Sequence, residues 1–307
     1  MNHSADKYLS RITGKLLGDG CITKQAGRKP RFQFIHRSED GAWSWYCYES
    51  LKNFLPLNPP KYKQATDFRL KQGFSESYIV QSKTAPIITH LEELWYTNRQ
   101  KQLPFQFITH YLDEEALAWW YQDDGHLKRK GSIVQKIILS TDSFSNLENT
   151  FLQQVLQDKF ELSFKLDGQN RLLLYDQPQI YYFLKLVEPY IHPCMSRKTA
   201  PKQEDLSLIG EPKRTTISLP KQFLFQKPTQ EINQAFYFTH EIISKLEDRQ
   251  SFFDFFRLAK YSLLSYDEFN NYQITVNAEN RINLSKIKQL TGWNQSQVTL
   301  LCLKERL

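Results

Sequence analysis

The sequence of 307 residues is poor in cysteine and has no long apolar run. Its four cysteines lie far apart, at Cys21, Cys47, Cys194 and Cys302. Because they form no Cys-x-x-Cys pair, we expect neither disulfides nor a structural zinc site. No stretch approaches the roughly 18 apolar residues that a membrane-spanning helix requires. We also expect no secretory signal, because the N-terminal segment lacks a charged leader followed by an apolar stretch.

Basic residues outnumber acidic residues by 40 to 33, so the net charge is +7 and the pI is about 9.0. The surplus lies mainly in residues 1–105, which carry +7, whereas residues 106–205 carry −3 and residues 206–307 carry +3. An excess of this size favours a polyanionic partner such as nucleic acid. With 40% hydrophobic and 24% charged residues, the composition is that of a globular protein. Proline next to polar residues near positions 105 and 205 suggests three units of similar length.

The first two units repeat one pattern of helices and strands, which predicts a duplicated α+β fold. Each copy begins with an apolar helix that runs into an acidic turn, Gly18-Asp19-Gly20 in the first copy and Asp123-Asp124-Gly125 in the second. The elements expected in the first copy are a helix at 8–17, strands around 31–36, a helix at 42–55, a hairpin at 61–82 and a helix at 87–96. Those expected in the second copy are a helix at 114–122, a strand at 133–140, a helix capped by Asp142 and reaching about 158, strands around 162–166 and 171–175, and a helix at 180–187.

The two acidic turns close the nonapeptides ITGKLLGDG (12–20) and LAWWYQDDG (117–125). These resemble the motifs of the LAGLIDADG homing endonucleases, in the form that carries both motifs in one chain. The second motif resembles the Trp-rich, Asp-Asp-Gly variant of one branch of that family. The resemblance implies pseudo-twofold duplicated αββαββα units with antiparallel DNA-binding saddles, followed by a mainly helical C-terminal extension. It also implies that the two motif helices pack against each other and that the acid before each final glycine, Asp19 or Asp124, enters one shared active site.

A metal site at the two acids follows from the resemblance and from the chemistry of carboxylates. Gly14 and Gly18 are small enough to let helix backbones approach closely. Carboxylate oxygens suit Mg²⁺, and Mn²⁺ or Ca²⁺ can occupy the same kind of site. The implied metal-binding set comprises Asp19 and Asp124 with the residues before them, Gly18 and Asp123. Taken alone, Asp-Gly at a helix end is an ordinary turn, but two copies in matching positions favour the active-site interpretation.

Four further residues are implied as catalytic. Lys198, after the last helix of the second copy, resembles the active-site lysine of the family, and Lys101 is its counterpart in the first copy. His36 and Thr141 end matching strands, where the family often places residues that organise solvent, and they are separated by the same offset as the two acids. Without the resemblance, both lysines would be ordinary surface charges and the histidine ordinary polar surface.

Sequence recognition is expected on the two saddles, because a curved antiparallel sheet can follow the major groove while alternate side chains point at base edges. The candidate readers in the first unit are Arg28, Arg31, Gln33, Arg37, Lys61, Lys63, Arg69 and Lys71. Those in the second unit are Lys128, Lys130, Gln135, Lys136, Lys165 and Arg171. Each of them is equally consistent with the solvated outer face of a strand.

The resemblance ends near residue 205, and residues 206–307 carry two local patterns of their own. Residues 214–220 look like the strand that opens ribbon-helix-helix proteins. Residues 284–307 predict two short helices around a Thr-Gly-Trp-Asn turn, similar to a helix-turn-helix in which 296–306 is the recognition helix. Either pattern could extend a DNA contact, and a helix pair that packs on the core is the alternative. The phenylalanine pairs within 252–256 are expected in the core.

The leading hypothesis is a monomeric, divalent-metal-dependent endonuclease that cuts both strands of a long, nearly asymmetric DNA target. Intron or intervening-sequence mobility is the outcome that the family implies. The alternative is an RNA splicing maturase, which would bind intron RNA, or a DNA-binding regulator that has lost cleavage. A pure binder has no need for two mutually repelling carboxylates, which favours the enzyme.

The position of the first motif and the absence of a leader lead to expectations about the form of the enzyme and its cellular location. Because the chain begins a few residues before its first motif, we expect a free-standing enzyme rather than an intein. We expect an intracellular location without membrane association. This would be an organelle, either a mitochondrion or a chloroplast, or the cytoplasm of a bacterium or a phage-infected cell.

Overall fold

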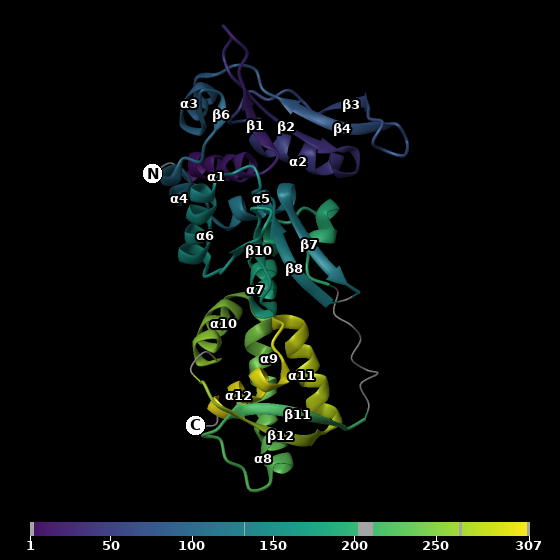
Figure 1. Ribbon diagram of the computed structural model, residues 1–307. Coiled ribbons are helices and arrows are strands. Elements are labelled where there is room, and N and C mark those ends of the chain that lie inside the picture. The colour runs from purple at the N-terminus through teal and green to yellow at the C-terminus, as the bar shows by residue number, and fades with distance from the viewer. Residues whose placement is uncertain (1–2, 132, 202–210, 264–265, 306–307) are drawn as a thin grey trace. The chain divides into compact units, whose positions relative to one another are not determined.

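The computed structural model describes residues 3–131, 133–201, 211–263 and 266–305 (Figure 1). The chain forms two compact units: unit 1 comprises residues 1–175 and 183–200, and unit 2 comprises residues 176–182 and 201–307. Unit 1 contains both copies of the repeated pattern, except that the first part of the last helix, residues 177–182, belongs to unit 2. Among the described residues, no helix is both long enough and apolar enough to cross a membrane.

The two halves of unit 1 have the same order of elements, αββαββα. In the first half these are α1 (His3–Leu17), β1 (Gly20–Thr23), β2 (Arg31–Arg37), α2 (Gly41–Leu51), β3 (Lys61–Thr66), β4 (Phe74–Gln81) and α3 (Pro86–Trp95). In the second half they are α5 (Glu114–Asp124), β7 (Gly125–Lys130), β8 (Ile133–Leu139), α6 (Asn146–Phe160), β9 (Lys165–Leu166), β10 (Leu172–Leu174) and α7 (Gln177–Val187). Both sheets are antiparallel and have equivalent strand orders, β1-β2-β4-β3 and β7-β8-β10-β9. The predicted duplicated α+β fold is therefore confirmed.

Short elements connect the main ones in unit 1. They are η1 (Ser38–Asp40), β5 (Tyr96–Thr97), β6 (Gln100–Lys101), α4 (Phe105–Tyr111), η2 (Glu188–Tyr190) and η3 (Pro193–Lys198). The sequence did not predict α4, because Pro104 suggested a boundary there. Pro104 instead occupies the N-cap of this helix in an extended conformation, a position where a missing N–H costs nothing.

Helix α6 begins later than the sequence predicted. Its N-cap is Ser145 and not Asp142. The backbone N–H of Glu148 donates to the Ser145 hydroxyl, and the backbone N–H of Ser145 donates to the Glu148 carboxylate at 2.8 Å. This reciprocal capping box satisfies two backbone donors that the helix itself cannot satisfy, so it determines where the helix starts.

Alternation along β2 separates a core face from a solvent face. Phe32 and Phe34 are fully buried, whereas Arg31 and Arg37 are exposed. In the second sheet the whole of β10 (Leu172–Leu174) is buried. The first sheet therefore has a clear polar face, while the polar part of the second sheet is concentrated on β7 and the start of β8.

Unit 2 pairs one antiparallel ribbon with a set of helices. Its elements are β11 (Lys213–Pro220), α8 (Pro228–Ala235), η5 (Phe236–Phe238), α9 (Thr239–Glu247), α10 (Arg249–Leu263), β12 (Phe269–Val276), α11 (Ala278–Thr291) and α12 (Gln295–Glu305). Phe252, Phe255 and Phe256 are buried, as predicted for the core, whereas Phe253 is half-buried. The ring of Phe256 stacks on Trp293 with centroids 5.0 Å apart.

The predicted helix pair near the C-terminus exists, but its second helix is not a recognition helix. α11 ends at Gly292, whose φ of +73° provides the left-handed turn into α12. Every residue from Val298 to Leu303 is buried. A recognition helix must present a solvent-exposed face to a groove, so this prediction is wrong over the described part of 296–306, and the packing alternative holds for α12. Arg306 lies outside the described residues.

Candidate active site

The two motif helices, α1 and α5, pack against each other at positions where no side chain fits (Figure 1). A Cβ atom on Gly14 would lie 2.4 Å from the carbonyl oxygen of Ala116. A Cβ atom on Gly18 would lie 2.6 Å from the Cβ atom of Asp123. Only glycine permits this approach, and it lets both helices deliver their last acidic residues to the same region of unit 1.

Asp19 and Asp124 are partly buried and electrostatically linked. The side chain of Asp19 is 35% exposed. Burial, followed by the negative charge of Asp123, raises the pKa of Asp19 to about 8, and Asp124 contributes in the same direction. Burial and the charge of Asp123 likewise raise the pKa of Asp124 to about 6. A bound cation would stabilise the ionised form of both carboxyls, which burial and the charge of Asp123 disfavour.

Asp123 is the hub of a buried network that the sequence did not predict. Its side chain has no exposed area and lies 2.8 and 3.0 Å, through its two oxygens, from the ammonium of Lys15, which is also fully buried. The indole N–H of Trp43 donates to the same carboxylate at 2.8 Å, and the backbone N–H of Asp19 donates at 3.3 Å. The network therefore holds the backbone of Asp19 in place.

The pair of Lys15 and Asp123 is ionised despite its burial. Burial alone would raise the pKa of Asp123, but the adjacent ammonium of Lys15 and the contact with His36 hold it well below its usual range. Burial alone would lower the pKa of Lys15, but the charge of Asp123 raises it above its ordinary value. Each charge is thus stabilised by the other.

His36 belongs to this network. Its side chain is almost fully buried, its Nε2 atom lies 2.8 Å from the Lys15 ammonium, and its Nδ1 atom lies 2.7 Å from the Ser44 hydroxyl. Since the ammonium can only donate, Nε2 accepts and the imidazole is neutral. Burial and the charge of Lys15 lower the pKa of His36 accordingly. Its nearest approach to Asp19 is 3.8 Å, so its predicted catalytic role would act through the buried network.

The two predicted lysines lie at the ends of the two motifs. Lys198, in η3, donates from Nζ to the carbonyl oxygens of Tyr121 at 2.9 Å and of Gln122, in the last turn of α5. Lys101 donates to the carbonyl oxygen of Gly20 at 3.1 Å. Burial lowers the pKa of each lysine to about 8, while the neighbouring aspartates oppose that shift. The structure thus brings both lysines to the acidic site, where each binds backbone oxygens.

Thr141 is held by contacts within the second half of unit 1 and does not belong to the network around Asp123. It is fully buried, and its hydroxyl donates to the carbonyl oxygen of Asn170 at 3.0 Å. Its own carbonyl accepts from the side-chain amide of Asn149 at 3.1 Å. These contacts fasten the end of β8 to the turn before β10, so Thr141 differs in environment from His36, its counterpart in the repeat.

The carboxyls of Asp19 and Asp124 are donors of the kind that a hard divalent cation prefers, but the group of ligand atoms that lie close together around Asp19 contains His36 and Asp123 rather than Asp124. Ligand atoms of Asp19, His36 and Asp123 lie within 4.8 Å of one another. Both oxygens of Asp123 already accept hydrogen bonds, and Nε2 of His36 faces Lys15. A cation at His36 and Asp123 would have to compete with the ammonium of Lys15. At Asp19 and Asp124 a cation would instead lower the raised pKa values of the two carboxyls.

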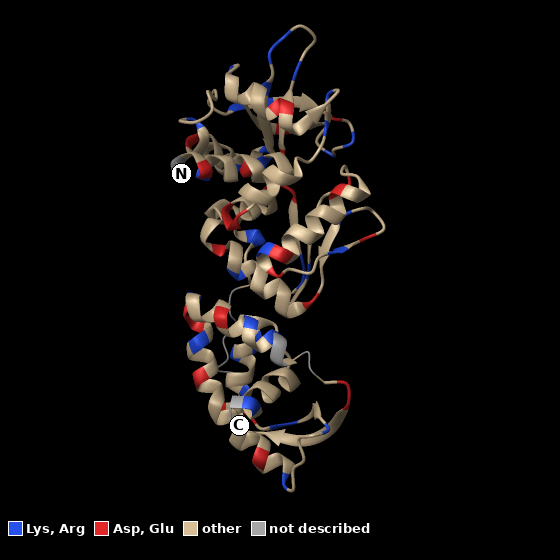
Figure 2. Cartoon of the chain, turned by 90° about the vertical axis from the view of Figure 1, so that its left-hand side faces the viewer, with Lys and Arg blue, Asp and Glu red and all other residues tan. Residues whose placement is uncertain are grey.

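Five of the eight predicted DNA-reading residues of the first unit share the outward face of its sheet: Arg31, Gln33, Arg37, Lys61 and Lys63. The lysines and arginines of the chain are blue in Figure 2. The register places Gln33 opposite both Cys21 and Gln81, and Lys61 opposite Ile79, so residues of all four strands share this face. Gln81 donates to Gln33 at 3.0 Å and accepts from Arg31 at 3.3 Å. These cross-strand bonds order the amides and guanidinium into a row.

The other predicted residues of the first unit, Arg28, Arg69 and Lys71, lie in its connecting loops. Arg28 lies in the loop between β1 and β2, and Lys71 lies in the turn between β3 and β4. In that turn Arg69 is paired with Asp67 at 2.8 Å. Arg37 lies at the end of β2 and donates to Asp40 at 2.8 Å. The exposed Lys63, on β3, is opposite Ser77.

The basic residues on the strands of the second sheet lie mainly on β7. Lys128 and Lys136 face each other across β7 and β8, and a register shift follows directly, so that Gln135 is the additional residue of a bulge. This is why the neighbours Gln135 and Lys136 are both accessible from strands that otherwise alternate. Lys130 ends β7 and Lys165 lies on β9.

Arg171 is engaged within a turn. Its guanidinium donates two hydrogen bonds to the carboxylate of Asp167, at 2.7 and 3.0 Å. A residue in this position stabilises the β9–β10 turn, and its predicted base-reading role remains a prediction.

Comparison with known proteins decides the family. The profile of the LAGLIDADG DNA endonuclease family matches residues 9–180. The chain belongs to this family. It is 28% identical over 210 residues to DNA endonuclease I-ChuI of Chlamydomonas applanata, an alignment that covers 62% of this chain and 92% of that protein. It is 29% identical over 194 residues to the uncharacterized protein MJ1098 of Methanocaldococcus jannaschii, covering 61% of this chain and 71% of that protein.

A solved structure supports the fold. The homing endonuclease I-WcaI bound to its DNA recognition sequence aligns with a TM-score of 0.56 and 22% identity, over 64% of this chain and 87% of that chain. The predicted family and fold class are thus confirmed, and the chain is a member of the LAGLIDADG DNA endonuclease family. The family profile does not extend into residues 206–307.

Lys15, Trp43 and Asp123 are the site residues that sequence reasoning missed or misassigned. Asp123 was predicted as a metal neighbour, but its carboxylate is the acceptor of the buried network. The one sequence feature that could have indicated this network is the lysine at position 15, inside an apolar helix. A charged residue on an apolar face is expected to have a buried partner.

Proposed function

We propose that this endonuclease makes a double-strand break in a long, nearly asymmetric DNA site by divalent-metal-dependent hydrolysis of phosphodiester bonds, and that it does so as a monomer. The observation that carries the proposal is the meeting of α1 and α5 at Gly14 and Gly18. This packing supports one active site that combines Asp19 and Asp124, in which burial, then the charge of Asp123 and to a lesser extent that of Asp124, raise the pKa of Asp19. Two motifs in one chain make a second copy unnecessary.

The residues of the chain have separate roles in this proposal. Asp19 and Asp124 would hold a divalent cation such as Mg²⁺, which when bound supplies a Lewis acid for water activation and for the leaving 3′ oxygen. Lys198 and Lys101 would supply positive charge for the phosphate oxygens, because each can turn from a backbone carbonyl toward an incoming anion.

The different faces of the two sheets support an asymmetric target. The first sheet offers an ordered row of guanidinium and amide groups, which suit guanine and adenine edges in the major groove. The second offers the lysine pair of β7 and β8, which suits phosphates more than bases. Each half would therefore read its half-site by different contacts.

Selection of cleaved sites from a randomised double-stranded DNA library, in Mg²⁺, tests the proposal. The unmodified chain should yield a single extended consensus. Asp19→Asn and Asp124→Asn should each bind the selected site and lose cleavage by at least 100-fold, since each removes a carboxylate while keeping its shape. Cleavage by both variants at the unmodified rate would refute the assigned chemistry.

Metal dependence and alternative activities are tested with the same selected DNA. Cleavage should disappear in EDTA and return with Mg²⁺ or Mn²⁺, and Ca²⁺ should support binding. Binding of the selected DNA without cutting under all of these conditions would refute the nuclease and favour a regulator. Preferential binding of intron RNA would favour a maturase. Sedimentation of the DNA complex should show one chain per duplex.

A further inference from the structure

The β11–β12 ribbon of unit 2 is a regular two-stranded element (Figure 1). Its eight residue pairs run without a break from Lys213 opposite Val276 to Pro220 opposite Phe269. The inner face is apolar, and its four aliphatic side chains are at most 1% exposed: Ile217, Leu219, Ile274 and Val276. This face is the part of the ribbon that packs into the core of unit 2.

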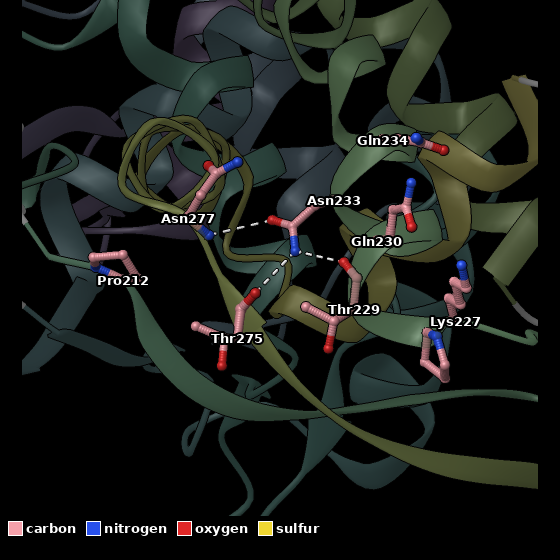
Figure 3. A pocket seen from close by; sticks show the side chains of 9 residues that line it. Pro212, Lys227, Thr229, Gln230, Asn233, Gln234, Thr275 and Asn277 are labelled. Carbon is pink, nitrogen blue, oxygen red and sulfur yellow. Dashed lines mark hydrogen bonds between the residues drawn. The ribbon is translucent and has the colours of Figure 1, made fainter.

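Both edges of the ribbon are covered by helix residues. On the β11 edge, the backbone N–H of Ser218 donates to the hydroxyl of Ser296 at 2.9 Å. On the β12 edge, the side-chain amide of Asn233 donates to the carbonyl oxygen of Thr275 at 2.8 Å (Figure 3). Asn233 also accepts from the backbone N–H of Asn277 at 3.2 Å. Because these groups occupy the edges, the ribbon is not built to add another strand.

The outward face is mainly polar. Alternation along the strands gives it six polar side chains, all of them exposed or half-buried: Arg214, Thr216, Ser218, Asn271, Gln273 and Thr275. The pair of Pro220 and Phe269 completes the face at one end, where Phe269 is exposed. Two cross-strand hydrogen bonds align the polar groups, from Arg214 to Gln273 and from Ser218 to Asn271, each at 2.6 Å. No carboxylate is among the six, and the exposed Lys213 adjoins the face at its first residue.

We propose that the outward face of the β11–β12 ribbon binds double-stranded DNA in the major groove, outside the part of the duplex that the two sheets of unit 1 hold. A two-stranded antiparallel ribbon fits this groove. Its guanidinium matches guanine, its amides match adenine, and the hydroxyl and methyl groups of threonine match either polar edges or the thymine methyl. The choice of DNA as the partner rests on the proposed function.

The distribution of charge along the ribbon also fits a DNA contact. The end of the ribbon at Lys213 and Arg214 is positive, whereas at the other end Lys221 is neutralised by Glu268 at 3.1 Å. The positive end would therefore approach a phosphate backbone, and the uncharged middle would lie over the base edges. This assigns a role to a segment that lies beyond the matched family profile.

The test uses the full-length chain and two duplexes, one cut to the selected cleavage site and one with long flanks on both sides. The unmodified chain should bind the long duplex about tenfold more tightly than the short one and should protect flanking DNA from hydroxyl radicals. The double variant Arg214→Ala/Gln273→Ala should bind both duplexes equally. Thr216→Glu, which adds a negative charge without removing a contact, should act in the same way.

A charge-matched control separates this effect from a general loss of positive charge. Lys288→Ala removes an exposed lysine of α11, away from the ribbon sequence, and should leave the preference for the long duplex intact. All variants should cut the short duplex at the unmodified rate and unfold at the unmodified temperature, because the replaced side chains are exposed.

The outcomes distinguish the two proposals. The ribbon proposal would be overturned if the unmodified chain bound both duplexes equally, or if the ribbon variants kept the preference for the long duplex. In either case, cleavage of the selected site would still support the proposed function. A ribbon variant that lost binding only to RNA would also overturn it. If the unmodified chain neither bound nor cut any duplex, both proposals would fall.

Discussion

Lys15→Met tests whether the buried ion pair organises the active site. In the unmodified protein the Lys15 ammonium lies 2.8 Å from Oδ1 of Asp123, and neither side chain has exposed area. At this distance the Coulomb attraction is about 6 kcal/mol for an effective dielectric constant of about 20. Methionine keeps most of the volume but leaves the Asp123 charge with the N–H groups of Trp43 and Asp19 and with the ring of His36, whose Nε2 atom lies 3.4 Å from Oδ1.

We expect this change to lower the free energy of unfolding by about 3 to 5 kcal/mol at neutral pH, the usual cost of leaving one partner of a buried pair unmatched. Without Lys15 the pKa of Asp123 rises, so the folded variant takes up a proton. Its deficit should therefore shrink as the pH falls toward 4 and grow as the pH rises. Urea denaturation of the metal-free protein, followed by circular dichroism, measures the difference.

A double-mutant cycle provides the control. Lys15→Met/Asp123→Asn removes both charges and keeps both shapes, so it should recover most of the stability that either single change removes. A loss below about 1 kcal/mol for Lys15→Met, or strict additivity in the cycle, would refute the view that these two charges stabilise each other.

Three further predictions concern the helix contact, the acids and a surface link. Gly14→Ala should cost about 1 to 3 kcal/mol in thermal unfolding, although alanine favours helices, because its Cβ atom would meet the carbonyl of Ala116 at 2.4 Å; a stabilised variant would contradict the close approach. The folded pKa of Asp124, about 6, lies above its unfolded value, so its contribution to stability is lost as the pH rises through 6. In EDTA, Asp124→Asn should therefore be about 2 kcal/mol more stable than the unmodified protein at pH 7 and equal to it near pH 4, as measured by denaturation in each buffer, and added Mg²⁺ should reverse the order. Asp40 accepts two hydrogen bonds from Arg197 at 2.8 Å, which help to hold the pKa of Asp40 below its usual range despite burial. Asp40→Asn should lower the free energy of unfolding by about 1 kcal/mol at neutral pH, and this deficit should vanish on acidification. A deficit that does not depend on pH would argue against this pair.

The duplicated fold could be predicted because its evidence is local and repeated. The apolar helices before the two acidic turns and the alternating strand after each of them are visible in sequence windows of ten to twenty residues. The cap of α6 was misplaced because Asp142 and Ser145 are both good N-cap residues, and only the reciprocal bond with Glu148 separates them.

The site was less predictable than the fold because its contacts are not local. The two acids stand out by position in the repeat, whereas the partner of Lys15 lies 108 residues away. The helix pair of unit 2 shows the same limit. Its turn at Gly292 is a local signal, but the burial of Val298–Leu303 depends on segments far away in the chain.

The buried lysine also breaks the equivalence of the two halves. By the spacing that relates the two acids, Lys15 corresponds to Trp120, and Asp123 corresponds to Gly18. The surroundings of the two acids thus differ, because the ion pair of Lys15 and Asp123 has no equivalent at Trp120 and Gly18. Scission of the two strands would then proceed at unequal rates, with a nicked duplex accumulating between the first cut and the second.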